Sequence, residues 1–149
     1  MFTSLLKNAK VTRIATDGAG AASATPTKGT IIDMASFDAV MFIAVMGNVL
    51  DTSQVALRVA GSDLNTSGSM ALLAGSAGGT AGASDYDDKL VILDVEKPRF
   101  RYLEAQLFHV TANAPFDAIL AIQYNAKSMP VTQGSTVVAS ASLAGPVAA

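Results

Sequence analysis

The chain has 149 residues, of which 50% are hydrophobic, only 15% are charged and none is cysteine. This length is typical of one domain with its own core, and the lack of cysteine excludes disulfides, thiolate metal ligands and cysteine nucleophiles. The formal net charge of −2 comes without a basic stripe, which argues against nucleic-acid binding, and so few charged residues favour a chain that buries surface against partners.

Hydropathy gives no indication of a membrane segment or of export. The longest apolar run, residues 39–46, is far shorter than the roughly 20 residues that a spanning helix needs. Residues 1–10 lack the long apolar core and the small-residue cleavage site of a signal peptide. We therefore expect no membrane partner.

The N-terminal segment leads into the first predicted strand. Phe2, Leu5 and Leu6 predict either one short helical turn or an apolar plug, and a strand is expected at residues 10–15. Residues 19–29, AGAASATPTKG, are small and polar, so they are interpreted as a loop.

Apolar and β-branched residues then recur in short runs. Further strands are expected at residues 30–34, 37–46, 54–60, 89–95, 99–110 and 118–126, with a short apolar piece at 70–73. The run FDAVMFIAVM, residues 37–46, is almost continuously apolar, as in a central strand buried on both faces. In QVALRVA, residues 54–60, the period of two puts Val55, Leu57 and Val59 on one face.

Turn and loop signals separate these runs. Residues 61–63 are expected to form a turn, and residues 75–88, GSAGGTAGASDYDD, a loop too rich in small residues to pack by itself. About eight short strands with almost no helical periodicity predict an all-β fold, an antiparallel β-sandwich or jelly-roll with flexible N- and C-terminal arms.

The predicted organisation has three parts. Residues 1–18 form the N-terminal arm and first strand, residues 19–132 the β-sandwich core, and residues 133–149 a C-terminal tail of small residues. The tail has no charged side chain, so it is either disordered or docked on a partner, for example by pairing with the sheet edge of a neighbouring subunit.

Catalytic and metal-binding constellations are not predicted, and neither is a cofactor. His109 is the one histidine, and a lone histidine without a matched nucleophile and acid makes no triad. Asp85, Asp87 and Asp88 lack the spacing of a calcium loop and are expected to be solvated. We therefore expect a protein that is not an enzyme.

Candidate interface residues lie in four segments of the chain. They are Phe2, Leu5, Tyr86, Arg99, Arg101, Val137 and Leu143. Arg99 and Arg101 share a strand face by the period of two, where they either pair with carboxylates of a partner or stay solvated.

The order of elements resembles a known family. The features are AVMFIAVMG, then VALRVAGSD with a Gly/Ser loop, then KLVILDVEKPRFRYLEAQL, a last apolar strand and a small-residue tail. From residue 37 to residue 131 the chain resembles the capsid decoration, or cement, proteins of tailed bacteriophages. No functional residue carries over, because the resemblance includes no functional motif.

The resemblance implies a structural virion protein. Such a protein is made in the host cytoplasm, binds the outside of an assembled phage head and stabilises it. Its expected partners are the major capsid protein and itself, as a homodimer or homotrimer.

Two alternatives stay open at this point. One is a tail, neck or fibre-base module of a phage. The other is a carbohydrate-binding β-sandwich, although tryptophan is absent and, of the three tyrosines, only Tyr86 falls in a predicted loop.

Overall fold

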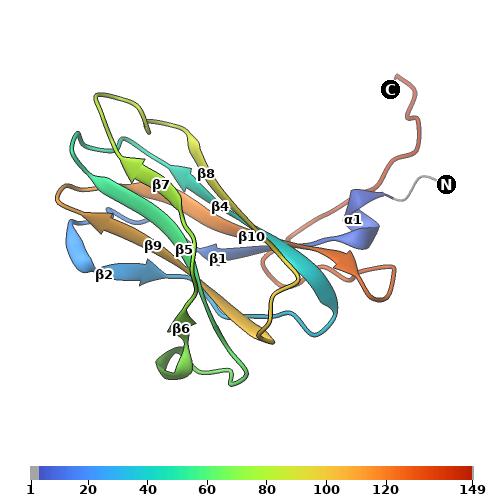
Figure 1. The fold of residues 1–149 in the computed structure, drawn as a ribbon. Helices are drawn as coiled ribbons and strands as arrows, with labels where there is room; N and C mark the ends of the chain where they lie inside the picture. The colour runs from blue at the N-terminus through green and yellow to red at the C-terminus, as the bar shows by residue number, and fades with distance from the viewer. Residues whose placement is uncertain (1–3, 149) are drawn as a thin grey trace.

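Two antiparallel sheets pack face to face in the computed structural model, which describes residues 4–148 (Figure 1). The elements in chain order are α1 (Leu5–Asn8), β1 (Lys10–Ala15), β2 (Ser23–Lys28), β3 (Ile32–Asp33), β4 (Phe37–Met46), β5 (Gln54–Ser62), the 3-10 helix η1 (Ser67–Ser69), β6 (Ala71–Leu72), β7 (Ala77–Thr80), β8 (Leu90–Glu96), β9 (Tyr102–Val110) and β10 (Phe116–Ala126). The prediction of an all-β sandwich is confirmed.

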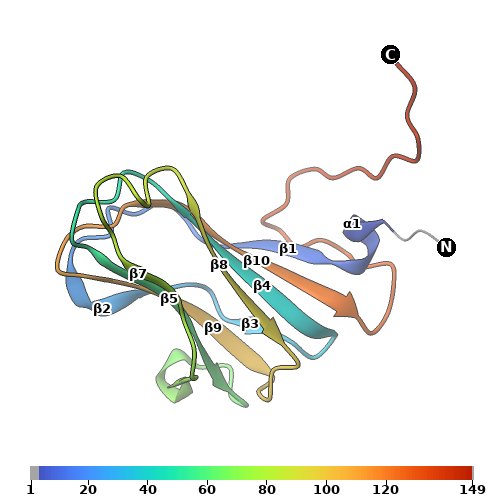
Figure 2. The ribbon, with the colours of Figure 1, turned by 45° about the horizontal axis from the view of Figure 1, so that its top comes forward.

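The strands of each sheet come from distant parts of the chain. Sheet A is four-stranded, with the order β1-β10-β4-β8, and these strands lie side by side in Figure 2. Sheet B is six-stranded: its main path is β2-β9-β5-β6, while β3 pairs with β9 and β7 pairs with β5.

The core lies between the inner faces of the two sheets. Phe42 of β4 and Ile119 of β10 meet Leu57 of β5 and Leu107 of β9, and all four side chains are completely buried. Each stabilises the fold by about 1.5–3 kcal/mol relative to an exposed position. The alternation predicted for residues 54–60 is confirmed, since Val55, Leu57 and Val59 all point inward.

Strand β4 differs from the prediction on its outer side. Met41, Ile43 and Val45 are only half-buried, whereas their neighbours along the strand are buried. The expectation that residues 37–46 are covered on both faces is therefore wrong. The physical reason is that sheet A has sheet B on one side only.

Two segments expected to be loops contain strands. β2 lies within residues 19–29 and β7 within residues 75–88, and both are held by backbone pairing to an inner neighbour of sheet B. An edge strand needs few large side chains and tolerates proline. In β7, Gly78 has φ +133°, and a Cβ there would lie 2.2 Å from the carbonyl oxygen of Val55.

The turn expected at residues 61–63 begins later, because Gly61 and Ser62 continue β5 and pair with β9. The strand expected at residues 99–110 starts only at Tyr102. In both places the backbone ladder, which the sequence pattern does not reveal, decides where pairing begins and ends.

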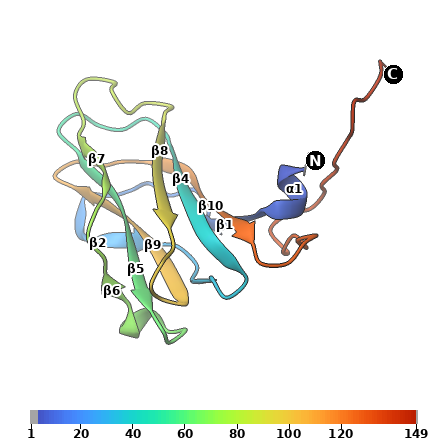
Figure 3. The same cartoon turned by 45° about the vertical axis from the view of Figure 1, so that its right-hand side comes forward.

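Helix α1 and the C-terminal segment that follows β10 lie together beyond one end of the sandwich (Figure 3). The expected helical turn is confirmed as α1, and residues 127–148 form no helix or strand. No helix within residues 4–148 has both the length and the hydrophobicity to cross a bilayer.

Candidate interaction surfaces

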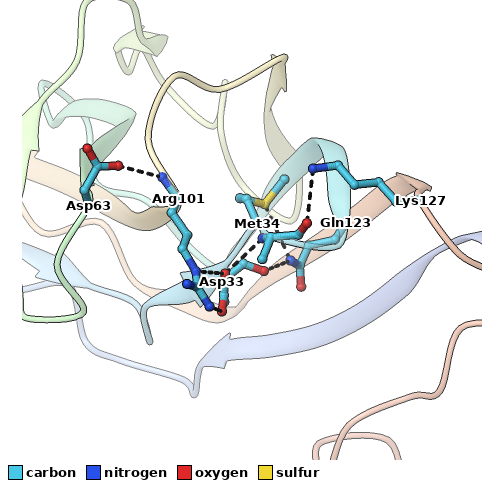
Figure 4. Close-up of polar contacts among 7 residues, drawn as sticks. Asp33, Met34, Asp63, Arg101, Gln123 and Lys127 are labelled. Atoms are coloured by element: carbon cyan, nitrogen blue, oxygen red, sulfur yellow. Dashed lines mark hydrogen bonds and ion pairs between the residues drawn. The ribbon is translucent and has the colours of Figure 1, made fainter.

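A bidentate ion pair joins β3 to the segment that leads into β9 (Figure 4). The Arg101 Nε donates to Asp33 Oδ1 at 3.0 Å, and its Nη2 donates to Asp33 Oδ2 at 2.8 Å. The hydrogen bonds from Arg101 hold the pKa of the Asp33 carboxyl below its usual value, and the same contact raises the pKa of Arg101. Both groups face solvent, which screens the pair.

A buried amide supports this ion pair from inside. Gln123, 3% exposed, donates from Nε2 to the carbonyl oxygen of Asp33 at 2.8 Å and contacts Met34 Sδ at 3.5 Å. Lys127 donates to the carbonyl oxygen of Ala35 at 3.1 Å. The loop between β3 and β4 is thereby fixed to β10.

Arg99 and Arg101 do not lie on one strand face, because both precede β9. They nevertheless line one cleft of about 460 Å³, together with Lys97 and Lys127. The carboxylates of Asp38 and Asp63 lie at the same cleft and offset part of this positive charge.

The outer face of sheet A is a second candidate surface. Its apolar side chains, which we call the apolar face, are Val11, Met41, Ile43, Val45, Leu90, Ile92, Ala118, Leu120 and Ile122. None belongs to the buried core cluster or packs against it. Leu90 and Ile92 are 56% and 47% exposed, so this face is open to a partner.

Charged groups flank the apolar face on opposite strands. Arg13 lies on β1, and its Nη2 donates to the carbonyl oxygen of Asp117 at 3.1 Å. Asp94 and Glu96 lie on β8. The hydroxyl of Tyr124 donates to Asp94, and this hydrogen bond raises the pKa of Tyr124 to about 12.

The C-terminal tail is held at its base and extended beyond it. The side chain of Gln133 accepts from the amide of Val11 at 2.9 Å, and the amide of Arg13 donates to Thr136 Oγ1 at 3.2 Å. Val137 is half-buried, but residues 138–148 are all exposed. Leu143, predicted as an interface residue, is 72% exposed.

The other predicted interface residues fall in different places. Leu5 is 69% exposed on α1. Tyr86 is half-buried and packs against the core cluster. It belongs to the segment between β7 and β8, which lies at the opposite end of the sandwich from α1 and the tail (Figure 1). Phe2 lies outside the described residues. The structure therefore brings Arg99 and Arg101 together, but it separates the segment that carries Tyr86 from α1 and the tail.

The polar side chains that were considered as catalytic or metal-binding residues, His109 and the aspartates of residues 85–88, make local contacts. His109 Nε2 lies 2.8 Å from Thr27 Oγ1, while its buried Nδ1 has no partner within residues 4–148. The carboxylates of Asp87 and Asp85 accept from the amides of Val49 and Gly82. No three or more His, Cys, Asp or Glu side chains of the described segment gather closely enough to hold a metal ion.

The apolar face was missed in the sequence, although one signal was present. Ala118, Leu120 and Ile122 share the outer face of β10, while the opposite face holds the buried Ile119 and Ala121. A strand that is apolar on both faces in a two-layer sandwich leaves one face uncovered. No protein-family model matches the chain, and no curated protein matches it either.

Proposed function

We propose that the chain is a capsid decoration protein, which binds the outside of an assembled phage head and stabilises it. The observation that carries this proposal is the C-terminal tail. Residues 138–148 are exposed, carry no charged side chain, and present Val138, Leu143 and Val147 at 103%, 72% and 91% exposure.

An exposed apolar arm on a folded core favours binding to a larger assembly. Eleven extended residues reach up to about 35 Å, far enough to cross from one subunit of a lattice to the next. Gln133 and Thr136 fix the base of the arm to β1. The apolar side chains of the arm therefore sample only the volume around this fixed point on the sandwich. That raises the effective concentration of the arm at a neighbouring site.

Mass action supplies the stabilisation. A protein that binds only the assembled shell stabilises each site by about 2.7 kcal/mol at a free concentration of 100 times Kd. Repeated over many sites, moderate affinity gives large resistance to rupture. The resemblance of residues 37–131 to phage cement proteins points the same way.

The test uses particles of the phage whose genome encodes the chain, made with and without its reading frame. Particles without the chain should release DNA at lower temperature, and the added full chain should restore the wild-type release temperature. A chain ending at Val137 should restore it less well. Equal release temperatures with and without the chain would overturn the proposal, and copies confined to one vertex would favour a tail or neck component.

A further inference from the structure

Strand β8 is an edge of sheet A, paired on one side with β4 (Figure 2). The amide of Met46 donates to the carbonyl oxygen of Lys89, just before β8. The amide of Lys97, just after β8, donates to the carbonyl oxygen of Asp38. Lys89 and Lys97 therefore direct their backbone groups towards β4. Because this direction alternates along an antiparallel strand, every second residue of β8 directs its amide and carbonyl away from the sheet. These residues are Leu90, Ile92, Asp94 and Glu96.

The outward amides of β8 are free to pair. Within residues 4–148, no backbone carbonyl outside the ladder with β4 accepts from any of the four. The strand has seven residues, no proline and no irregularity in its register. It is thus a long, regular edge of the kind to which another strand adds.

The other sheet edges of the described segment are protected. Side chains of the tail occupy the edge of β1, where the amides of Val11 and Arg13 donate to Gln133 and Thr136. β2 contains Pro26 and a shift in register, while β6 and β7 have only two and four residues. Natural sheets use such devices to prevent pairing at their edges, so the lack of one at β8 indicates that this edge has a partner.

Space for an added strand lies beside the first half of β8. A cleft of about 400 Å³ is lined there by Leu90 and Ile92, by Tyr86, and by Ala77 and Gly78 of β7. The small residues of β7 leave room for extended backbone. Leu90 and Ile92 are apolar and about half exposed, so a strand in this position would cover them.

The side chains of β8 define the chemistry of the strand that fits. On the inner face, Leu93 and Val95 are half-buried and pack against the core cluster, so they favour apolar neighbours at alternate positions. On the outer face, Glu96 is exposed and forms no ion pair within residues 4–148, and Asp94 adds a second carboxylate. Opposite charges on adjacent strands attract, so the positions facing this end of β8 favour lysine or arginine.

We propose that β8 accepts one additional strand from a different protein, an extended segment with apolar residues at alternate positions and basic residues at the end that faces Glu96. The outward backbone groups of β8 give the affinity, and the alternating side chains give the specificity. The added strand runs antiparallel to β8, which is the more stable pairing per residue. In a virion the segment would belong to the shell, and that assignment alone rests on the proposed function.

The purified full chain tests the edge without a virion. The probe is an acetylated and amidated peptide as long as β8, in which valine alternates first with lysine and then with threonine. At about 1 mM it should shift the NMR amide resonances of the four outward residues and slow their hydrogen exchange about tenfold. The same peptide N-methylated at its lysines and threonines has no amide to donate to β8 and should have no effect.

Two substitutions separate the backbone from the charge. Ile92→Pro removes one outward amide but leaves the ladder with β4, so it should weaken peptide binding at least about tenfold, whereas Ile92→Val should stay within about threefold of the wild type. Glu96→Lys should weaken binding about fivefold by placing like charges together, and it decides the matter if circular dichroism shows that Ile92→Pro is unfolded. Asp51→Lys, the same kind of change at an exposed turn, is the control and should bind as the wild type does.

Strand addition would be overturned by a peptide that leaves the β8 amides unshifted, by an equal effect of the N-methylated peptide, or by folded Ile92→Pro and Glu96→Lys variants that bind undiminished. Shifts of the same amides that grow with the concentration of the chain alone would replace it by pairing between copies. Heads that bind Ile92→Pro as well as the wild type would overturn the shell as the source of the strand and leave the proposed function standing. A chain that binds the peptide but no heads would overturn the proposed function and leave strand addition standing.

Discussion

The hydroxyl of Tyr124 on β10 reaches across β4 to the carboxylate of Asp94 on β8, whose two oxygens lie 2.7 and 2.9 Å away. The contact joins two strands that are not neighbours in sheet A. Ionised Tyr124 would lose this hydrogen bond and face a negative charge, so its pKa is raised to about 12. The pair closes one end of the apolar face.

Asp94→Asn should lower the pKa of Tyr124 towards its ordinary value of about 10, measured by the near-ultraviolet absorbance of the tyrosinate. Because the folded-state pKa is raised, the contact stabilises the fold fully below about pH 10 and loses this contribution as the pH rises through about 12. Tyr124→Phe identifies the transition, and Tyr102→Phe should leave it in place. An unchanged titration in Asp94→Asn would contradict the assignment.

The Asp33–Arg101 pair predicts that the difference in stability between the wild type and Arg101→Ala depends on pH. Arg101→Ala should lower the free energy of unfolding only slightly at neutral pH, because the pair is exposed and solvent screens it. The pKa of Asp33 is lowered, mainly by the hydrogen bonds from Arg101, so this contribution is present above the ordinary carboxyl pKa of 3.8 and disappears as the pH falls through the folded-state value.

Urea unfolding of the wild type and of Arg101→Ala between pH 7 and pH 2 measures the difference in their free energies of unfolding. Arg99→Ala is the matched control, since Arg99 forms no ion pair within residues 4–148. Its effect should be close to zero at every pH. A difference for Arg101→Ala that persists unchanged at the acid end would show that the side chain acts through packing on Tyr102, whose ring centre lies 5.0 Å from its Cζ.

Gly20 occupies a place where only glycine fits. Its φ is +53°, a Cβ would lie 1.9 Å from the carbonyl oxygen of Ala114, and its own carbonyl accepts from the amide of Ala114 at 2.9 Å. Gly20→Ala should therefore lower the free energy of unfolding by about 3 kcal/mol, from the left-handed backbone and the forced displacement. Gly68→Ala, with nothing within 4 Å of its added Cβ, should change it by less than about 0.5 kcal/mol. Similar urea midpoints for both variants would contradict this account.

The sequence predicted the strands whose side chains carry the core. Strands β1, β4, β5 and β10 contain all of the residues predicted for them, 10–15, 37–46, 54–60 and 118–126, and β5 and β10 extend two residues further. Their alternating or continuous apolar residues are what the core requires. β2 and β7 could not be predicted, because Ser23–Lys28 and Ala77–Thr80 pair through backbone groups that every residue has.

The candidate surfaces were harder to predict than the core. Arg101 was found as a charged residue, but its partner Asp33 lies 68 positions away and is brought near only by the pairing of β3 with β9. The apolar face depends on the order of the strands in sheet A, and the side chains of β1, β4, β8 and β10 become one surface only in that order. A pattern along one strand carries no information about its neighbours.

The base of the C-terminal tail depends on Gln133, whose side chain replaces a missing strand partner at the edge of β1. Its Oε1 accepts from the amide of Val11 at 2.9 Å, and its Nε2 donates to the carbonyl oxygens of Leu6 and Ala9 at 3.2 and 2.7 Å. Gln133→Ala should lower the free energy of the local opening by about 1–3 kcal/mol, because these groups lose their partner. Amide hydrogen exchange at Val11 should therefore accelerate about 5- to 150-fold, while exchange in the buried β9 stays unchanged. Ser140→Ala, in the exposed arm, is the control and should leave both rates unaltered. Unchanged protection of Val11 in Gln133→Ala would mean that the tail is not fixed to β1 in solution, and the argument that its arm searches from a defined origin would fail with it.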